Sequence, residues 1–431
     1  MSTSPQQLAA QQAQVQAMLQ AQKRQNRQFM AYSLNKEVLC QQANGGANSQ
    51  PFATGQPLTF NITTSNNGFL TGFWVRVSLS LALAAGTSAT YSTTAAYPLN
   101  TLDSIVVNYG QTQHNFRPYM LKYYSQLQGQ THQVQPRAIT SGVSNSNIDS
   151  YYTNVIASSQ NITVTGNKTI NYAIYVPMAL LHPQDVRGIL PVQNGETTCQ
   201  VIVNCAASLY GSDAILNPFA IGTGAGTGQA VTVNAGASSQ VQVIAIYKDG
   251  MSFRQLNGLQ PNMQGIETVQ FLRDTPLVNI QANQIFTGKV SFLHKIPYLF
   301  ITVLDGVQTS SFSLISNTNI LQTSADATGN RLFYRYGTNT NLDLREWYSD
   351  LCGAQGGLLQ QDIDEGIYPL VYAPQFQQAD AGILEGDHYL DMSTASGWTD
   401  FHYGIQLGSV GSNGAPRVEV HAIILNDPLV M

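Results

Sequence analysis

The segment FWVRVSLSL, residues 73–81, places an apolar residue at every odd position and mostly polar residues at the even positions. This period of two is typical of a β-strand with one buried face and one face toward water or a partner. Similar short runs, separated by turn residues, recur along the chain from Pro57 onward. The sequence therefore predicts an all-β protein built from antiparallel sheets.

The expected strands fall into two series. The first comprises residues 58–62, 73–81, 102–107, 169–176, 199–205 and 231–246. The second begins near Pro261 and comprises residues 269–272, 277–280, 290–293, 299–304, 367–372, 401–407 and 418–425. A chain of 431 residues, 43% of them hydrophobic, is long for a single hydrophobic core. Two such series therefore predict two domains.

The two series end alike. VQVIAI at residues 241–246 and VEVHAI at residues 418–423 share the pattern V-x-V-x-A-I, and each is soon followed by an aspartate, Asp249 and Asp427. This match predicts a duplicated fold, with one domain over residues 46–250 and another over residues 251–431. Chance similarity is the competing interpretation, because alternating valines are common in strands.

Each half also contains one helix-like interruption. In the first half we expect a short helix over residues 177–190, where several apolar residues lie at irregular spacing. In the second half a helix is expected from Asp343 through Trp347 toward Gln361, with Asn341 or Asp343 as its N-cap.

Residues 1–45 differ from the rest and are expected to form a helical arm followed by a linker. Gln and Ala dominate the first 35 residues, and Pro5 stands where a helix can begin. An apolar stripe spans about 120° of the helical wheel, with three cations to one side. The stripe consists of Leu8, Val15, Met18, Leu19, Phe29 and Met30, and the cations are Lys23, Arg24 and Arg27. A stripe this thin fits a membrane surface, a neighbouring subunit or a loosely ordered tail.

Charged residues are scarce in this chain. They make up 10% of it, against about 25% in typical proteins, and the net charge is −5. Few charges mean little cost of desolvation when surfaces are buried, which favours extensive contact with other subunits. A soluble secreted β protein with a neutral surface has the same composition. The absence of a Lys/Arg cluster argues against sequence-specific nucleic acid binding.

The cysteines indicate reduced thiols. Cys199 and Cys205 stand at the two ends of one expected strand, about 20 Å apart, which is too far for a disulfide. The start of the chain is rich in Gln rather than apolar, so no signal peptide is expected. We therefore expect synthesis in a cytoplasm, and no run is long enough to predict a transmembrane helix.

Motifs that carry enzymatic chemistry are missing from the sequence. GxSxG, GxxxxGK[ST] and HExxH are absent, and the glycine-rich run at residues 222–228 does not match GxGxxG. We therefore predict no catalytic residue, no cofactor and no metal site. Two other classes stay open: a receptor- or carbohydrate-binding β-sandwich spike, and a polysaccharide hydrolase, which would need clustered carboxylates.

Several motifs occur in the order known from one viral family. They are the Gln/Ala-rich start at residues 6–28, GFLTGFWVRV at residues 68–77, VPMA at residues 176–179, Trp347 in its expected helix, and GIY at residues 366–368. Over nearly its whole length the chain thus resembles the major capsid proteins of tectiviruses, tailless phages with a lipid membrane inside an icosahedral shell. Their corresponding motifs are an N-terminal helix, G-x-x-x-G-F-x-V-x-V, V-P-L-A and G-V-Y.

The resemblance implies two tandem eight-stranded jelly rolls, with an N-terminal helix and one short helix inserted in each roll. It implies a homotrimer of pseudo-hexagonal outline that tiles the virion capsid together with neighbouring capsomers and with vertex and minor capsid proteins. It further implies a virus-coded protein made in the host cytoplasm. The arm would face the internal membrane through Leu8, Val15, Leu19, Lys23, Arg24 and Arg27.

Overall fold

The computed structural model describes residues 5–33, 35–43, 45–62, 68–83, 88–93, 99–110, 112–118, 120–121, 148–151, 161–181, 185–192, 198–207, 219–221, 232–234, 238–248, 261, 268–277, 285–292, 294–308, 311–314, 331–336, 339–343, 367–371, 389–392, 401–406 and 416–426.

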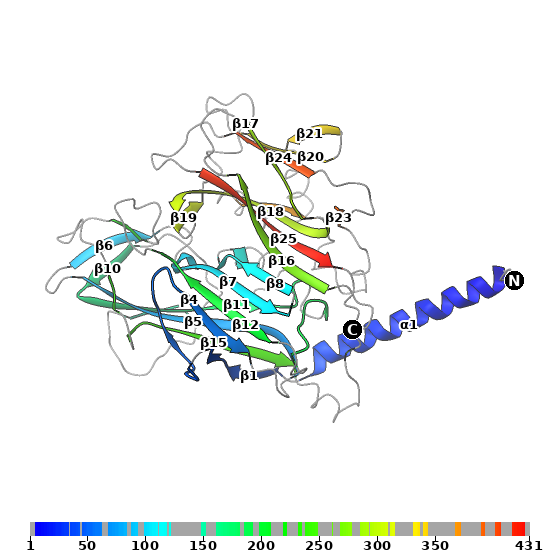
Figure 1. Cartoon of the computed structure of the whole chain (residues 1–431), viewed down its shortest axis with the longest axis horizontal. Helices are drawn as coiled ribbons and strands as arrows, with labels where there is room; N and C mark the ends of the chain where they lie inside the picture. Colours follow the sequence, from blue (N-terminus) through cyan, green and yellow to red (C-terminus); the bar gives the residue numbers. More distant parts are fainter. Residues whose placement is uncertain are drawn as a thin grey trace.

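A long helix, α1 (Pro5–Tyr32), projects from a body made of β-sheets (Figure 1). The helix begins at Pro5, where the fixed φ of proline suits the first helical position and its missing N–H costs no hydrogen bond. The predicted N-terminal helix is therefore confirmed. The next residues, which were expected to be a linker, enter the sheets as β1 (Asn35–Leu39) and β2 (Gln41–Gln42).

The first half of the body comprises β1 to β15. The remaining elements of this half are β3 (Gln50–Pro51), β4 (Pro57–Ile62), β5 (Phe69–Ala82), β6 (Ser88–Thr93), η1 (Leu99–Thr101), β7 (Leu102–Tyr109), β8 (Thr112–Phe116), β9 (Ile148–Tyr151), β10 (Asn161–Thr165), β11 (Asn167–Pro177), β12 (Cys199–Cys205), β13 (Phe219–Ile221), β14 (Thr232–Val233) and β15 (Gln240–Lys248). Sheet 1 has the order β1-β15-β5-β11-β9, with β14 paired to β5 and β3 to β15. Sheet 2 has the order β2-β4-β12-β7-β8, and a small third sheet has the order β10-β6-β13.

The second half comprises β16 to β25. Its strands are β16 (Thr268–Leu277), β17 (Ile285–Lys289), β18 (Lys295–Gln308), β19 (Ser311–Leu314), β20 (Arg331–Tyr336), β21 (Asn339–Asp343), β22 (Ile367–Val371), β23 (Leu390–Asp391), β24 (Phe401–Gln406) and β25 (Pro416–Asn426). Sheet 3 has the order β16-β25-β18-β19, with β22 and β23 also paired to β18. Sheet 4 has the order β17-β24-β20-β21.

The same strand order recurs in the two halves. Sheet 1 contains β1-β15-β5-β11 and sheet 3 contains β16-β25-β18-β22, so in each half the first strand pairs with the last. Sheet 2 contains β4-β12-β7-β8, and sheet 4 repeats this order with β17-β24-β20-β21. The hairpins β7–β8 and β20–β21 also correspond, with Tyr109 opposite Thr112 and Tyr336 opposite Asn339, and in the sequence a Gly follows each of these tyrosines.

One hydrophobic core runs through both halves. Alternate residues of β12 are buried between sheets 1 and 2, as the period of two predicts. Cys199 and Cys205 are separate buried thiols at its ends, and burial raises the pKa of each to about 12. The same cluster includes Phe271 and Phe300 of sheet 3, so the second half packs onto the first through apolar side chains.

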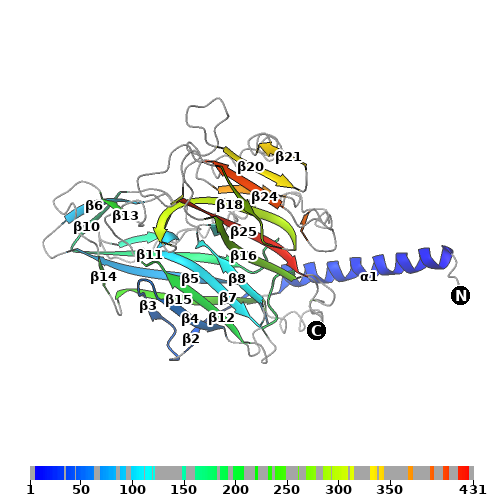
Figure 2. The same ribbon diagram turned by 45° about the horizontal axis from the view of Figure 1, so that its top comes forward.

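Strand β25 is buried on both faces. Residues 417–425 are all buried, although side chains alternate between the faces of a sheet. One set, which includes Ile423, belongs to the core shared with the first half. In Figure 2, β16 and β25 lie next to β7 and β8 of the first half. Sheet 3 is therefore the layer that joins the two halves.

The helix expected over residues 177–190 is absent from the described part of that segment, residues 177–181 and 185–190. Backbone groups there pair with β5 instead: Leu70 and Leu190 exchange hydrogen bonds of 2.9 and 3.0 Å, and Met178 N–H donates to Thr71. Gly188 has φ of +91°, and a Cβ there would lie 2.3 Å from the carbonyl oxygen of Met178. The segment thus needs glycine in a left-handed conformation, which does not fit a helix.

Two further predictions, a strand and a helix, concern the second half of the chain. The strand expected at residues 290–293 lies instead at Ile285–Lys289, where backbone pairing with β24 defines it; Val290 and Phe292 are buried without belonging to a strand. The helix expected from Asp343 toward Gln361 lies outside the described residues, apart from Asp343, which ends β21.

Candidate functional site: the projecting helix and the junction of the two halves

The foot of α1 is fixed to the body. Phe29 and Met30 are buried in an apolar cluster completed by Phe69, Ala179, Val186 and Ile189. The rings of Phe29 and Phe69 meet edge to face with centroids 5.3 Å apart. Beyond the helix, Lys248 Nζ donates to the carbonyl of Ser33 over 3.0 Å. These contacts hold the last turns, so the direction in which α1 projects is defined by packing.

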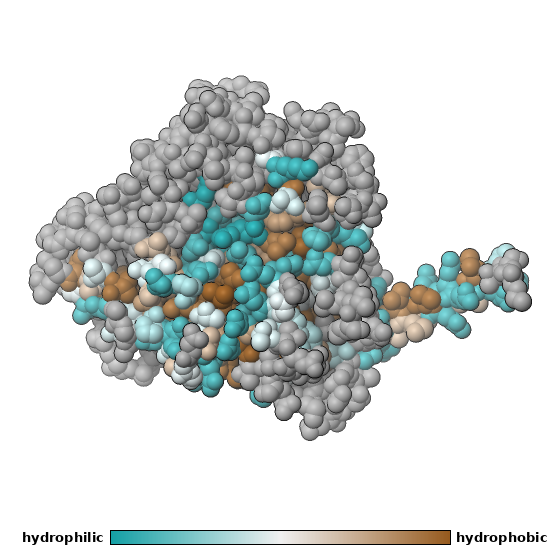
Figure 3. Space-filling model, in the orientation of Figure 1, coloured by the Kyte–Doolittle hydropathy of each residue, from teal (hydrophilic) through white to brown (hydrophobic). Residues whose placement is uncertain are grey.

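The rest of α1 carries its apolar stripe into solvent. The exposed fractions of Leu8, Val15, Met18 and Leu19 are 50%, 56%, 72% and 47%. Figure 3 shows apolar groups interleaved with polar ones along this projecting helix. The described helix is not apolar enough over a sufficient length to cross a membrane.

Two of the three predicted cations lie on the same exposed length. Lys23 and Arg24 are exposed, whereas Arg27 is half-buried near the foot of the helix. The structure thus places the six predicted arm residues on one projecting element.

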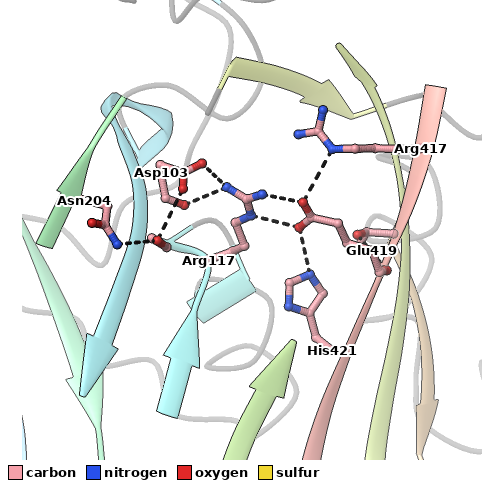
Figure 4. A network of polar contacts seen from close by, with 8 residues as sticks. Asp103, Arg117, Asn204, Arg417, Glu419 and His421 are labelled. Carbon is pink, nitrogen blue, oxygen red and sulfur yellow. Dashed lines mark hydrogen bonds and ion pairs between the residues drawn. The ribbon is translucent and has the colours of Figure 1, made fainter. Parts of the chain in front are cut away.

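A buried ionic network occupies the junction of the two halves (Figure 4). Arg117, directly after β8, lies between Asp103 of β7 and Glu419 of β25. Its Nε donates to Glu419 Oε2 over 2.8 Å, and its Nη2 donates to Glu419 Oε1. Its Nη1 donates to the Asp103 carbonyl over 2.9 Å and to the Asp103 carboxylate. The side chains of Arg117 and Glu419 are only 2% and 1% exposed.

Glu419 is surrounded by cationic and polar groups. Arg417 Nε lies 3.6 Å from Oε1, and His421 Nε2 lies 3.6 Å from Oε2. Burial by itself would raise the pKa of Glu419, but the charge of Arg117, with the Arg117 hydrogen bonds and the nearby His421 imidazole, holds that pKa well below its usual value. Glu419 is therefore ionised and links the second half to the Arg117 guanidinium of the first.

Aromatic contacts lie beside this network. The N–H of Phe271 in β16 donates to His114 Nδ1 over 3.2 Å, and the rings of Phe116 and Phe271 are 5.0 Å apart. Burial lowers the pKa of His114 to about 4 and also lowers the pKa of His421, although the neighbouring Glu419 acts in the opposite direction. Both imidazoles are therefore neutral at neutral pH.

The ionic contacts at this junction have a structural role. A bidentate Arg–carboxylate pair is a directional contact between two planar groups, and here it joins residues 302 positions apart in the chain. Among the described residues, no group of three or more His, Cys, Asp or Glu side chains is arranged to hold a metal ion.

Sequence reasoning did not single out Arg117, Glu419 or His114. The segment VEVHAI did contain a clue, because Glu419 and His421 interrupt an apolar strand on one face. A buried charge needs a partner, but the sequence could not identify a partner as distant as Arg117.

Comparison with known proteins links the fold to one structural class. No sequence-family model matches the chain, and no functionally characterised protein shows significant sequence similarity to it. The crystal structure of the STIV major capsid protein matches with a TM-score of 0.51 and 11% identity, covering 92% of this chain and 97% of that one. The PBCV-1 virus capsid matches with a TM-score of 0.51 and 12% identity, covering 91% of this chain and 94% of that one. The Faustovirus major capsid protein matches with a TM-score of 0.52 and 8% identity, covering 93% of this chain and 91% of that one.

These structural neighbours are double-jelly-roll major capsid proteins of icosahedral viruses. At such low identities the likeness establishes a common fold. The chain therefore has a double-jelly-roll fold, in agreement with its resemblance to the tectivirus capsid proteins.

Replacing Arg117 by Met is expected to lower the free energy of unfolding by about 3–5 kcal/mol, because Glu419 would keep a buried charge without its main partner. The double variant Arg117→Met/Glu419→Leu should lose less than Arg117→Met alone, since it removes both charges. Chemical denaturation of the three proteins measures the difference. A double variant at least as unstable as the single one would contradict this view of the pair.

A matched control is Arg187→Met. Arg187 lies 2.9 Å from Asp185, and its side chain is 18% exposed. Because this pair is closer to solvent, its loss should cost only about 1 kcal/mol or less.

Stability is expected to fall as the pH is lowered from about 6.5 to about 4. In this window His114 takes up a proton in the unfolded chain but not in the folded protein. The free energy of unfolding should therefore fall by on the order of 3 kcal/mol across the window. The pKa of Glu419 is also depressed, so its contribution is lost only below about pH 4.5. Urea unfolding at several pH values across this range measures the slope of the free energy of unfolding against pH.

The variant His114→Asn keeps an acceptor for the Phe271 N–H but cannot take up a proton. We expect its slope between pH 4.5 and 6.5 to be smaller by up to about 1.4 kcal/mol per pH unit. An unchanged slope would show that His114 is not responsible for the acid sensitivity.

Proposed function

We propose that this chain is a major capsid protein that assembles as pseudo-hexagonal trimers and tiles the icosahedral shell of a virus around an internal membrane and genome. The observation that carries the proposal is the double-jelly-roll fold, which matches three viral capsid proteins over more than 90% of each chain. The function is structural, and no enzymatic activity is part of it.

Each half is proposed to be an eight-stranded jelly roll. The first roll would use β1, β4, β5, β7, β8, β11, β12 and β15, and the second β16, β17, β18, β20, β21, β22, β24 and β25. The recurrence of one strand order supports this assignment. The boundary between the rolls would lie near residue 250, as the sequence predicts, with the first roll starting at β1 rather than at residue 46.

Two similar rolls in one chain suit a hexagonal outline. Three copies present six rolls, and the junction around Arg117 and Glu419 would keep the two rolls of each copy in a fixed arrangement. The low content of charge suits surfaces that are buried against neighbouring capsomers and against vertex and minor capsid proteins. Synthesis in the host cytoplasm and residence in the virion capsid follow from this role.

The arm is proposed to contact the internal membrane. Its apolar residues, including Leu8, Val15 and Leu19, are exposed on one stripe, and Lys23 and Arg24 are exposed nearby. A helix with a thin apolar stripe and flanking cations favours the surface of a bilayer that contains anionic lipids. Such binding is weak for one arm and becomes strong when many arms share one shell.

The capsid proposal predicts a homotrimer of about three times 46.8 kDa in dilute buffer. Light scattering measures the mass, and electron microscopy should show particles with threefold symmetry and a hexagonal outline. A stable monomer at all accessible concentrations would contradict the proposed function.

The membrane proposal predicts that the variant Leu8→Gln/Val15→Gln/Leu19→Gln loses flotation with vesicles of phosphatidylglycerol and phosphatidylcholine, while its trimer stays intact. The foot of the helix is untouched by these changes, so the fold should be unaffected. A matched control, Ala10→Gln/Ala13→Gln/Ala21→Gln, alters the opposite face of the same helix and should still float. Equal flotation of both variants would remove the membrane role from the stripe.

A further inference from the structure

We propose that the outer face of sheet 2 is a self-complementary surface, which meets the same face of a second copy in a neighbouring trimer across a twofold axis. The face is formed by β2, β4, β12, β7 and β8, which lie in this order in the sheet (Figure 2). The inference rests on the proposed capsid function and adds which surface joins one trimer to the next.

An unbroken row of amide side chains crosses this face. Gln41 of β2 pairs with Asn61 of β4, and Asn61 pairs with Gln200 of β12. Gln200 pairs in turn with Asn108 of β7, and Asn108 pairs with Gln113 of β8. Every strand of the sheet therefore places one amide at the same level, with neighbouring strands about 4.8 Å apart.

The alternation of the strands directs this row away from the core. In β12, Val201 and Val203 are 0% exposed on the inner face, whereas Gln200 is half-buried on the outer face. Gln41 and Gln113, at the two ends of the row, are exposed. The amide row is thus accessible to another molecule.

The described residues of this face carry no charge, although about a quarter to a third of a typical surface is charged. Asp103 borders the face, but Arg117 holds its carboxylate. A face without charge is not repelled by its own copy. The described residues of the face are Gln41, Thr59, Asn61, Ser104, Val106, Asn108, Gln113, Asn115, Gln200, Ile202 and Asn204.

The amides make the face self-complementary. A carboxamide has two N–H donors and an oxygen that accepts two hydrogen bonds. Gln200 Nε2 donates to Asn61 Oδ1 over 3.1 Å, and Gln113 Nε2 donates to Asn108 Oδ1 over 2.9 Å. Each of these bonds uses one of the two donors of its glutamine. A surface that both donates and accepts can bind its own copy, as an isologous contact requires.

The position of α1 determines the direction of the twofold axis. The foot of α1 packs against Phe69, the first residue of β5, so the helix leaves the body at one end of the strands (Figure 1). Two copies in one shell would direct this helix to the same side. An axis parallel to the strands keeps that orientation and reverses the order of the strands across the contact. Gln41 of one copy would then face Gln113 of the other.

The size of the face indicates that the contact belongs between trimers. Five strands about 4.8 Å apart, with about 3.4 Å per residue along them, give an area on the order of 400 Å² per copy. A stable pair of proteins typically buries about 800 Å² per partner. One such contact is therefore too weak to hold two copies in dilute solution, and repetition over many subunits strengthens it.

The test compares two pairs of charges at the same two positions of the full-length protein. Gln41→Glu/Gln113→Glu places like charges opposite one another across the proposed axis, whereas Gln41→Glu/Gln113→Lys places opposite charges there. The control Gln11→Glu/Gln14→Glu adds the same net charge as the first variant to the arm. All four residues are exposed, so each variant should fold and form trimers, which circular dichroism and light scattering verify.

Sedimentation velocity of concentrated trimers at low salt measures their further association. The like-charge variant should raise the dissociation constant between trimers roughly tenfold or more. The opposite-charge variant and the arm control should associate at least as well as the wild type. The difference between the two pairs should shrink at high salt, because these charges are exposed.

A second measurement identifies the contact directly. Gln200→Cys, in a chain that also carries Cys352→Ser, places one thiol at the centre of the row, while Cys40, Cys199 and Cys205 are buried. A short bismaleimide should join two chains of different trimers through this new thiol. Mass spectrometry should find the same peptide of β12 on both sides of the link.

Three outcomes would overturn this inference while the capsid proposal stands. They are two charge pairs that behave alike, links within one chain or to another part of the neighbouring chain, and trimers that stay separate at every accessible concentration. A wild-type monomer would instead overturn the proposed function and this inference with it.

Discussion

The contact on which the rest of the structure depends is the buried pair between Arg117 and Glu419. It joins the residue after β8 to the middle of the last strand, so it fixes the second half against the first. Two charges of this kind are costly to remove from water, and only good geometry and further hydrogen bonds offset that cost. The pair therefore contributes mainly a specific arrangement of the two halves, while the shared apolar core contributes most of the stability.

The proposals for this chain depend on which surfaces of its sheets and of α1 are buried and which are exposed. Sheet 3 is buried on both sides because it closes its own half and also packs on the first half. Sheet 1 has the same build, yet its outer face keeps accessible side chains such as Arg76. The helix α1 likewise buries its foot and exposes its length. Surfaces of this kind are consistent with the proposed role in a shell, where other molecules would complete the packing.

The sequence by itself determined the all-β class, the extent of α1 and the recurrence of one strand pattern, because each depends on local periodicity and on residues such as Pro5 that act on their own backbone. It misplaced β17 and predicted a helix at residues 177–190, where pairing of Leu190 with β5 overrides local preference. Only the tertiary structure decided the partner of Glu419 and which sheet face stays accessible. Those depend on contacts between residues hundreds of positions apart, and local sequence patterns carry no record of them.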